Sequence, residues 1–199
     1  MPGGTLKIVG TDELEVDRAL LAGEFGCPGC GGRLRPWGSA RWRVLRWPGG
    51  EVRRRPRRTR CAGCGATHVL LSADGLLRRR DVAEVIGLAL VAKARGLGHR
   101  AAAVVVGVPV STVRGWLRRF AVNAEAIRVW FTVLAHDLDP MLAPMVPTAT
   151  PLGDAVDAIA VAARAASLRL GPVKAWSFAS SASAGRLLSN TGWPWAPAG

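Results

Sequence analysis

The pattern of apolar and polar residues changes near residue 81. Before this point, residues 41–44 (RWRV) alternate between basic and apolar side chains, which is typical of a half-buried strand, and residues 48–50 (PGG) predict a turn. Between residues 81 and 95, apolar side chains recur every three or four positions, as they do along one face of a helix. The pattern therefore predicts a mostly α-helical protein with a small β region before most of its helices.

The chain is expected to fall into five parts. Residues 1–26 should hold a short strand (6–9) and a helix that Thr11 caps and Gly23 ends. The other parts are a β region at 27–80, a three-helix segment at 81–122, a C-terminal helical region at 123–188 with a proline-rich linker at 139–151, and an irregular tail at 189–199. Further expected elements are a loop at 37–39, strands at 51–55 and 69–71, and helices at 123–138, 154–170 and 175–188.

The only four cysteines form two CxxC pairs, which we expect to bind one structural zinc ion. Thirty residues separate the pair Cys27 and Cys30 from the pair Cys61 and Cys64. Both thiolates of a CxxC turn can reach one metal, the neighbouring glycines leave backbone N–H groups free to point at sulfur, and four cysteines close a tetrahedral site. This spacing predicts a zinc ribbon, with two disulfides or four free thiols as the alternatives. His68, four residues after Cys64, could compete as a ligand, but with four cysteines present it is expected to be a strand residue beside the site or a phosphate contact.

A second motif, from His99 to Arg118, predicts a helix-turn-helix. Ala103 is small where two helices would touch, and Gly107 can adopt the left-handed conformation that the turn requires. Apolar residues occupy the offsets that fix the crossing of the helices: Val108, Val113 and Trp116. A plain helical hairpin with a solvated basic face is the alternative interpretation.

If the second helix lies in a major groove, its outward side chains would face the bases. These base-reading residues are Ser111, Thr112, Arg114 and Arg118. Arg114 could form a bidentate pair with guanine, which is worth about 1–3 kcal/mol of discrimination against other bases.

The net charge of +13 is concentrated in the β region. Residues 27–80 carry 14 basic and 2 acidic side chains, whereas residues 121–199 carry 5 of each. Because like charges repel one another, such a concentration usually has a polyanionic partner, and we expect nucleic acid. A solvated basic face, enlarged by arginine-rich codon usage, is the alternative, although such a bias should affect the whole chain. The residues expected to contact phosphates are Arg53, Arg54, Arg55, Arg57, Arg58, Arg60, Arg100 and Arg119.

Three tryptophans lie among these arginines, at Trp37, Trp42 and Trp47. Aromatic side chains between basic ones can stack on unpaired bases. A ribbon of this size buries little else, however, so we expect the three tryptophans to form its core.

Neither a signal peptide nor a membrane span is expected. The apolar stretches at 82–94 and 155–166 are interrupted by charge and are shorter than the roughly 20 residues that a span needs. We therefore expect a soluble, cytoplasmic protein whose thiols stay reduced. No phosphate-binding glycine loop, nucleophile elbow or Cys/His dyad occurs, so no catalytic residues are predicted and an enzyme is not expected.

The order of the motifs resembles that of known DNA-binding proteins. CPGCGG (27–32), CAGCGATH (61–68) and GVPVSTVRGWLRRF (107–120) are similar to the N-terminal DNA-binding halves of several insertion-sequence transposases. They resemble more closely a family of short actinobacterial proteins that pair a zinc ribbon with a helix-turn-helix. The resemblance covers about residues 20–122, and it implies four cysteine zinc ligands and a DNA-reading helix over 110–120. Transposases continue into an RNase H-like catalytic domain, for which this chain has no room, so only the binding half is expected.

Together these features predict a zinc-stabilised, sequence-specific protein that binds double-stranded DNA, as a transcriptional regulator or a mobile-element accessory factor. One alternative is an adaptor that recruits a separate transposase or polymerase to DNA through residues 121–199. Another is an RNA-binding zinc ribbon. The alanine-rich C-terminal helices also suggest a homodimer, because their small apolar surface exceeds what a monomer usually exposes.

Overall fold

The computed structural model describes residues 5–189, and helices dominate this part of the chain. It is about 47% helical and about 19% strand, which confirms a mostly α-helical protein with a small sheet. In chain order the elements are β1 (Thr5–Val9), α1 (Glu13–Ala22), β2 (Leu34–Ser39), β3 (Arg43–Trp47), β4 (Gly50–Arg54), β5 (Arg57–Cys61), β6 (Thr67–Ser72), α2 (Ala83–Ala94), α3 (His99–Val106), α4 (Val110–Val122), α5 (Ala124–Leu138), α6 (Pro151–Leu170) and α7 (Ala175–Ala182).

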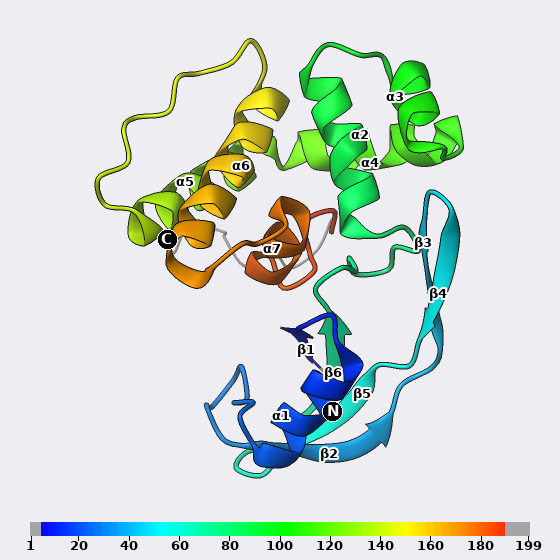
Figure 1. Cartoon of the computed structure of the whole chain (residues 1–199), viewed down its shortest axis with the longest axis vertical. Coiled ribbons are helices and arrows are strands. Elements are labelled where there is room, and N and C mark those ends of the chain that lie inside the picture. Colours follow the sequence, from blue (N-terminus) through cyan, green and yellow to red (C-terminus); the bar gives the residue numbers. More distant parts are fainter. Residues whose placement is uncertain (1–4, 190–199) are drawn as a thin grey trace.

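A four-stranded sheet in the order β1-β6-β5-β2 forms the lower part of the molecule in Figure 1. β1 pairs with β6 in parallel, whereas β6 with β5 and β5 with β2 are antiparallel pairs. The N-terminal strand therefore belongs to the same sheet as the strand that carries Cys61. The expected parts 1–26 and 27–80 thus form one structural unit. We call residues 5–72 the β unit and residues 83–189 the helical unit.

The loop expected at residues 37–39 was wrong, because these residues belong to β2. The register between β2 and β5 shifts between Pro36 and Ser39, and Gly38 within this shift has a φ of 85°. An irregularity of this kind accommodates a glycine that the sequence pattern reads as a loop. Residues 57–61, expected only to lead into the second cysteine pair, likewise form a strand.

Asp12, rather than the expected Thr11, caps the N-terminus of helix α1. The Asp12 carboxylate accepts hydrogen bonds from the backbone N–H groups of Leu14 (2.8 Å) and Glu15 (3.2 Å), so it caps the helix. The helix ends at Gly23, as expected, in the left-handed conformation with a φ of 77°.

The β3–β4 hairpin leaves the sheet and reaches the helical unit, as the right side of Figure 1 shows. The Arg46 N–H donates to the carbonyl of Arg80 (2.7 Å), and the Val82 N–H donates to the carbonyl of Arg46 (3.0 Å). Leu45 is buried in the same core as the helices, and Arg46 forms an ion pair with Asp81 (3.3 Å). The hairpin thus joins the two units.

Helices α2, α3 and α4 pack around Phe120, which is fully buried, and α5 and α6 form a close pair beside them (Figure 1). The alanine-rich face of α6 is buried within the chain: Ala155, Ala158, Ala162 and Ala166 are all inaccessible to solvent. The surface that suggested a dimer is therefore covered by the chain itself. The linker has no regular structure up to Thr150, whose hydroxyl caps α6 through the Gly153 N–H (3.1 Å).

The expected helix at 175–188 is shorter than predicted. It ends at Ala182, because Ala184 and Gly185 both adopt positive φ values, of 49° and 72°. The Gly185 carbonyl accepts a hydrogen bond from the Leu77 N–H (2.7 Å), which ties this turn to the segment after β6. Apart from Ser189, the expected tail lies outside the described residues. Within residues 5–189, no helix combines the length and the apolar character needed to cross a membrane.

The buried apolar residues form two clusters of unequal size. The larger cluster fills the helical unit, whereas the β unit has a small one: Val9, Val16, Leu20, Cys27, Leu34, Cys61 and Leu70. Two members of the small cluster are cysteines. A core this small rarely stabilises a fold without disulfides or a metal, so the chemistry of the cysteines decides the stability of the β unit.

Candidate metal centre and basic surface

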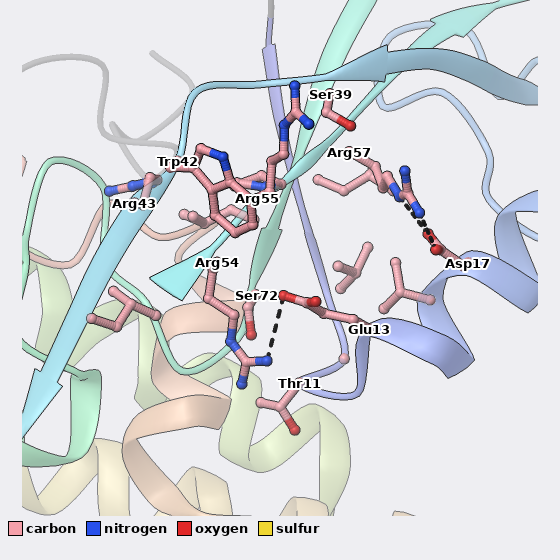
Figure 2. Close-up of a pocket in the computed structure, with 17 residues that line it drawn as sticks. Thr11, Glu13, Asp17, Ser39, Trp42, Arg43, Arg54, Arg55, Arg57 and Ser72 are labelled. Atoms are coloured by element: carbon pink, nitrogen blue, oxygen red, sulfur yellow. Dashed lines mark hydrogen bonds and ion pairs between the residues drawn. The ribbon is translucent and has the colours of Figure 1, made fainter. Parts of the chain in front are cut away.

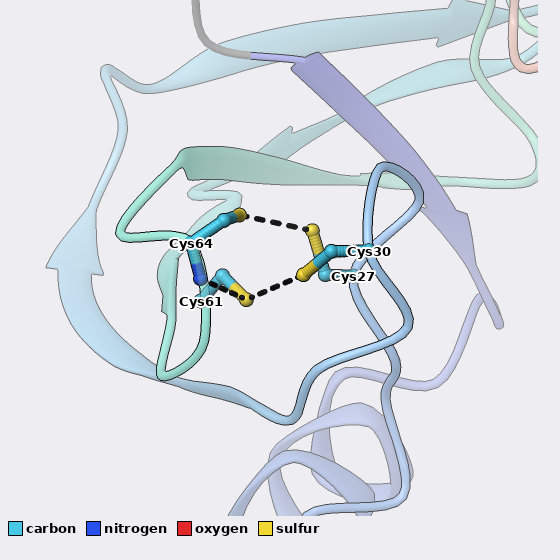
Figure 3. Close-up of side chains that lie close together, drawn as sticks. All are labelled: Cys27, Cys30, Cys61 and Cys64. Atoms are coloured by element: carbon cyan, nitrogen blue, oxygen red, sulfur yellow. Dashed lines mark hydrogen bonds between the residues drawn. The ribbon is translucent and has the colours of Figure 1, made fainter.

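The four cysteines lie together, and their sulfur atoms are all within 4.8 Å of one another (Figure 3). The Sγ atoms of Cys27 and Cys64 are 3.8 Å apart, and those of Cys30 and Cys61 are 3.4 Å apart. All four are free thiols, so the disulfide alternative is excluded in this structure. A tetrahedral site with metal–sulfur bonds of about 2.3 Å needs sulfur–sulfur distances of about 3.8 Å. The cluster can therefore hold one metal ion.

The two cysteine pairs are built alike. In the first, the Cys27 N–H donates to the Gly32 carbonyl (2.8 Å), and the Gly31 N–H donates to the Cys27 carbonyl (2.9 Å). In the second, the Cys61 N–H donates to the Ala66 carbonyl (2.8 Å), and the Gly65 N–H donates to the Cys61 carbonyl (3.1 Å). Gly31 and Gly65 both have positive φ, which explains a glycine directly after each pair. Two matching turns thus present their sulfur atoms to one point.

Gly32 allows the two turns to approach closely. A Cβ atom at this position would lie 3.0 Å from the Cys61 sulfur and 3.3 Å from the Cys30 sulfur. Any side chain at Gly32 would therefore push apart atoms that the metal site needs together. Gly29, inside the first turn, is less confined, since its Cβ would meet only the Cys27 sulfur, at 3.9 Å.

The thiols of the cluster differ in acidity. The backbone N–H of Cys64, helped by those of Gly63 and by the Cys30 thiol, lowers the pKa of Cys61 to about 6. The Gly32 N–H also lowers the pKa of Cys30, but the neighbouring thiols and burial outweigh it and raise this pKa to about 11. Of these two thiols, Cys61 is therefore the one that ionises more readily.

His68 lies beside the cluster, as expected, and not within it. It is on β6 with an exposed fraction of 2%, and its Nε2 is 3.3 Å from the Cys27 sulfur. Burial and the positive charge of Lys7 lower the pKa of His68, which favours its neutral form. In the tautomer that carries its proton on Nε2, this imidazole can donate a hydrogen bond to the Cys27 sulfur.

The residues predicted to read bases lie on α4, after a turn at Gly107. This glycine has a φ of 63°, as the predicted turn requires, and α4 begins at Val110, with Pro109 in the cap position. Ser111, Arg114 and Arg118 are exposed, whereas Thr112 is half-buried. The opposite face of α4 is core: Val113, Trp116, Leu117 and Phe120 are buried. The exposed face of α4 is therefore free to contact a partner.

A groove separates the tip of the β3–β4 hairpin from the turn before α4. It has a volume of about 410 Å³, and its walls include Trp47 and Pro48 of the hairpin and Gly107 and Pro109 of the turn. The basic hairpin and the start of α4 are thus neighbours, although about 60 residues of sequence separate them.

The residues predicted to contact phosphates fall into two groups. Arg53, Arg55, Arg58, Arg60 and Arg100 are exposed and form no ion pair within the described chain. Arg54 is bound to Glu13 (3.4 Å) and Asp74 (3.6 Å), and Arg57 is bound to Asp17. Arg119 is half-buried and donates to the Gly115 carbonyl (3.0 Å). Carboxylates therefore hold Arg54 and Arg57, and a backbone carbonyl holds Arg119, which their sequence positions did not reveal.

The three tryptophans of the β unit are not core residues, contrary to expectation. Trp37, Trp42 and Trp47 keep 54%, 55% and 44% of their surface exposed. The core of the β unit consists of aliphatic side chains and cysteines instead, and α1 covers it. The sequence showed that these residues are large and apolar but not which way they point.

Trp42 stands at the edge of a cavity of about 280 Å³ between the sheet, α1 and the base of the hairpin. Figure 2 shows Trp42 beside Arg43 and Arg55, while Arg54 and Arg57 reach the carboxylates of Glu13 and Asp17 on α1. The Arg54 Nε and the Ser72 hydroxyl, both in its wall, are buried and have no hydrogen-bond partner among residues 5–189. Burial also lowers the pKa of Arg43, another wall residue. No sequence pattern predicted this cavity.

Comparisons with known proteins add no relative: the chain matches no protein-family model, no curated protein and no solved structure.

Proposed function

We propose that this protein is a zinc-stabilised DNA-binding protein of the regulator or mobile-element accessory type. One observation carries the proposal: the basic β3–β4 hairpin and the turn that precedes α4 line one groove. A partner could therefore contact two adjacent elements: the basic hairpin, through its positive charge, and the exposed face of α4.

In this proposal zinc is the structural ion, held by Cys27, Cys30, Cys61 and Cys64. Four thiolates suit zinc in a closed tetrahedral site with no open position for water, which fits stabilisation rather than catalysis. Zinc would hold the ends of β5 and of the turn before β2 together, and so fix the strands from which the hairpin projects.

Duplex DNA is the proposed partner of α4. Arg114 and Arg118 would reach base edges in a major groove, with Ser111 beside them, and Arg100 would contact the flanking phosphates. The hairpin arginines without ion pairs would add affinity that does not depend on sequence but falls with salt, by a log–log slope of about −0.9 per neutralised phosphate. Arg54 and Arg57 are assigned no phosphate contact, because carboxylates already hold them.

The first test is selection of random duplex DNA with the zinc-loaded protein at near-physiological salt. We expect a defined motif, and we expect Arg114→Ala to weaken binding to it about 5- to 150-fold while relaxing the preference at one base pair. The matched control is Arg164→Ala, an exposed arginine on α6 that forms no ion pair within the described chain. Enrichment without a motif, or equal losses for both variants, would refute the role of α4.

A second test concerns the close approach of the two cysteine turns. We expect Gly32→Ala to weaken zinc binding at least tenfold, because its Cβ would crowd two of the four sulfur atoms. Gly29→Ala is the matched control, since its Cβ would make only an ordinary contact with one sulfur. Competition with a chromogenic chelator measures both affinities. Equal affinities in the two variants would show that the turns can separate without loss of the site.

A further inference from the structure

Trp37 and Trp42 stay more than half exposed on the most basic part of the chain. A tryptophan ring is among the largest apolar surfaces that a protein has, and exposing it to water is unfavourable unless something covers it in use. Scattered exposed leucines or valines need no such explanation. Here the exposed residues are all tryptophans, and they share one segment with the arginines, so their surroundings can indicate the partner.

Guanidinium groups hold the rings in place. The Arg60 guanidinium lies 5.0 Å from the centre of the Trp37 ring, and those of Arg53 and Arg55 lie 5.2 and 5.8 Å from the centre of the Trp42 ring. Arg60 also donates to the Gly65 carbonyl (3.3 Å), which ties this contact to the second cysteine turn. The rings are therefore positioned before any partner arrives.

These three arginines form no ion pair within residues 5–189, in contrast to Arg54 and Arg57 of the same strands. Their charge is available to a partner. Each ring thus combines an open aromatic surface with an uncompensated positive charge, and a partner that fits must supply flat aromatic groups and negative charges in alternation.

The tryptophans follow the chain from the cysteine cluster toward α4. Trp37 borders a shallow groove that also contains Arg35, Arg60 and the second cysteine turn. Trp42 lies at the mouth of the cavity in Figure 2, and Trp47 lies in the groove beside the turn before α4. Successive tryptophans are five residues apart in the sequence: Trp37 lies on β2, Trp42 between β2 and β3, and Trp47 at the end of β3. In Figure 1 this path runs along β2 and then up β3 to the helical unit.

We propose that this tryptophan–arginine surface binds single-stranded DNA. Unpaired bases would stack on Trp37, Trp42 and Trp47, and the phosphates between them would contact Arg53, Arg55 and Arg60. A duplex cannot use the rings, because its bases are already stacked on one another. The choice of DNA over RNA rests on the proposed function, since the path ends at the helix assigned to duplex DNA. An unpaired strand along β2 and β3 would then replace duplex phosphates at Arg53, Arg55 and Arg60, while α4 stays free to hold a duplex.

The test measures binding of fluorescein-labelled (dT)20 by polarisation, with the zinc-loaded full chain at 100 mM salt. We expect Trp37→Ala and Trp42→Ala each to weaken binding about tenfold, and Trp42→Phe to retain most of it, because the phenyl ring still stacks. Leu21→Ala is the matched control, since it removes an exposed apolar side chain of α1. Thermal melts followed by circular dichroism check that each variant is folded. We expect melting temperatures close to that of the unaltered protein, because the substituted side chains are exposed.

Different measurements test the single-strand proposal and the duplex proposal, so either one can fail without the other. Arg114→Ala should leave (dT)20 binding unchanged, and the tryptophan variants should leave binding of a selected duplex motif within about twofold. No saturable (dT)20 binding by the unaltered protein at micromolar concentrations, or equal losses for Trp42→Ala and Leu21→Ala, would overturn the single-strand surface. Tighter binding of (rU)20 than of (dT)20 would overturn the assignment to DNA.

Discussion

Removing the proposed zinc ion is expected to unfold the β unit while α5 and α6 keep their structure. Zinc binding by four thiolates in small units supplies about 10–16 kcal/mol, which matches or exceeds the entire net stability of a typical domain. The β unit has little to replace it, because its buried cluster contains only five apolar residues besides two of the cysteines. The helical unit has its own larger core, so the loss should stay local.

Hydrogen exchange read by mass spectrometry separates these outcomes. After chelation, amides of β2, β5 and β6 should exchange within seconds, while those of α5 and α6 should stay protected. Cys64→Ser should do the same without chelator, and Ser181→Ala, which alters an exposed side chain of α7, serves as the control. Metal analysis should give one zinc per chain. A circular dichroism spectrum and an exchange pattern that chelation leaves unchanged would contradict the structural role of the metal.

Unfolding of the β unit should also disorder the β3–β4 hairpin, which carries part of the proposed DNA-binding surface. Among the described strands, β3 and β4 pair with each other alone, and the Ala40 N–H donates to the Pro56 carbonyl (2.8 Å) where they join β2 and β5. Leu45 and the Arg46–Asp81 ion pair still anchor the tip to the helical unit. Metal-free protein should therefore keep weak duplex binding through α4 and lose the salt-dependent share that the hairpin arginines supply.

Features that depend on neighbouring residues could be predicted from the sequence, because their physics is local. A CxxC turn followed by glycine brings two thiols together through a few hydrogen bonds, and both turns form as expected. Gly107 is likewise the residue with positive φ between α3 and α4, since the turn there demands it. The position of His68 beside the cluster follows from its place on the next strand.

Features that depend on distant contacts could not be predicted. The carboxylates that neutralise Arg54 and Arg57 come from α1 and from the segment after β6, and nothing in the arginine-rich run shows this. The tryptophans were expected in the core because a small β unit needs apolar volume, but α1 covers the sheet and supplies that volume. The parallel pairing of β1 with β6 joins residues about 60 apart and has no local signal.

Gly87→Ala is expected to destabilise the native protein but to stabilise a variant that lacks the Trp176 ring. Trp176 of α7 lies so close to α2 that a Cβ atom at Gly87 would be 2.1 Å from the ring. The Ser177 N–H donates to the Glu84 carboxylate (3.1 Å), one turn earlier on α2, so α7 has little freedom to move away. Overpacking against a rigid, buried ring should cost about 2 kcal/mol in the free energy of unfolding.

In a variant without the Trp176 ring, Gly87→Ala should raise the free energy of unfolding instead of lowering it. Trp176→Ala alone should cost about 3–5 kcal/mol, because it empties a buried site between α2 and α7. In that background Gly87→Ala meets no ring, and alanine stabilises a helix interior by about 1 kcal/mol relative to glycine. Gly115→Ala on α4 is the control, since its Cβ would meet only the mobile end of Arg119, at 3.0 Å. It should stabilise by a similar amount in either background.

Urea unfolding of the four proteins in this cycle measures the coupling between Gly87 and Trp176. A coupling of about 3 kcal/mol would show that the α2–α7 contact is rigid and contributes strongly to the stability of the helical unit. Because α2 also packs against α3 and α4, this contact supports the helix assigned to the duplex. Equal effects of Gly87→Ala in both backgrounds would show that α7 moves aside freely, and α7 would then contribute nothing to the position of α4.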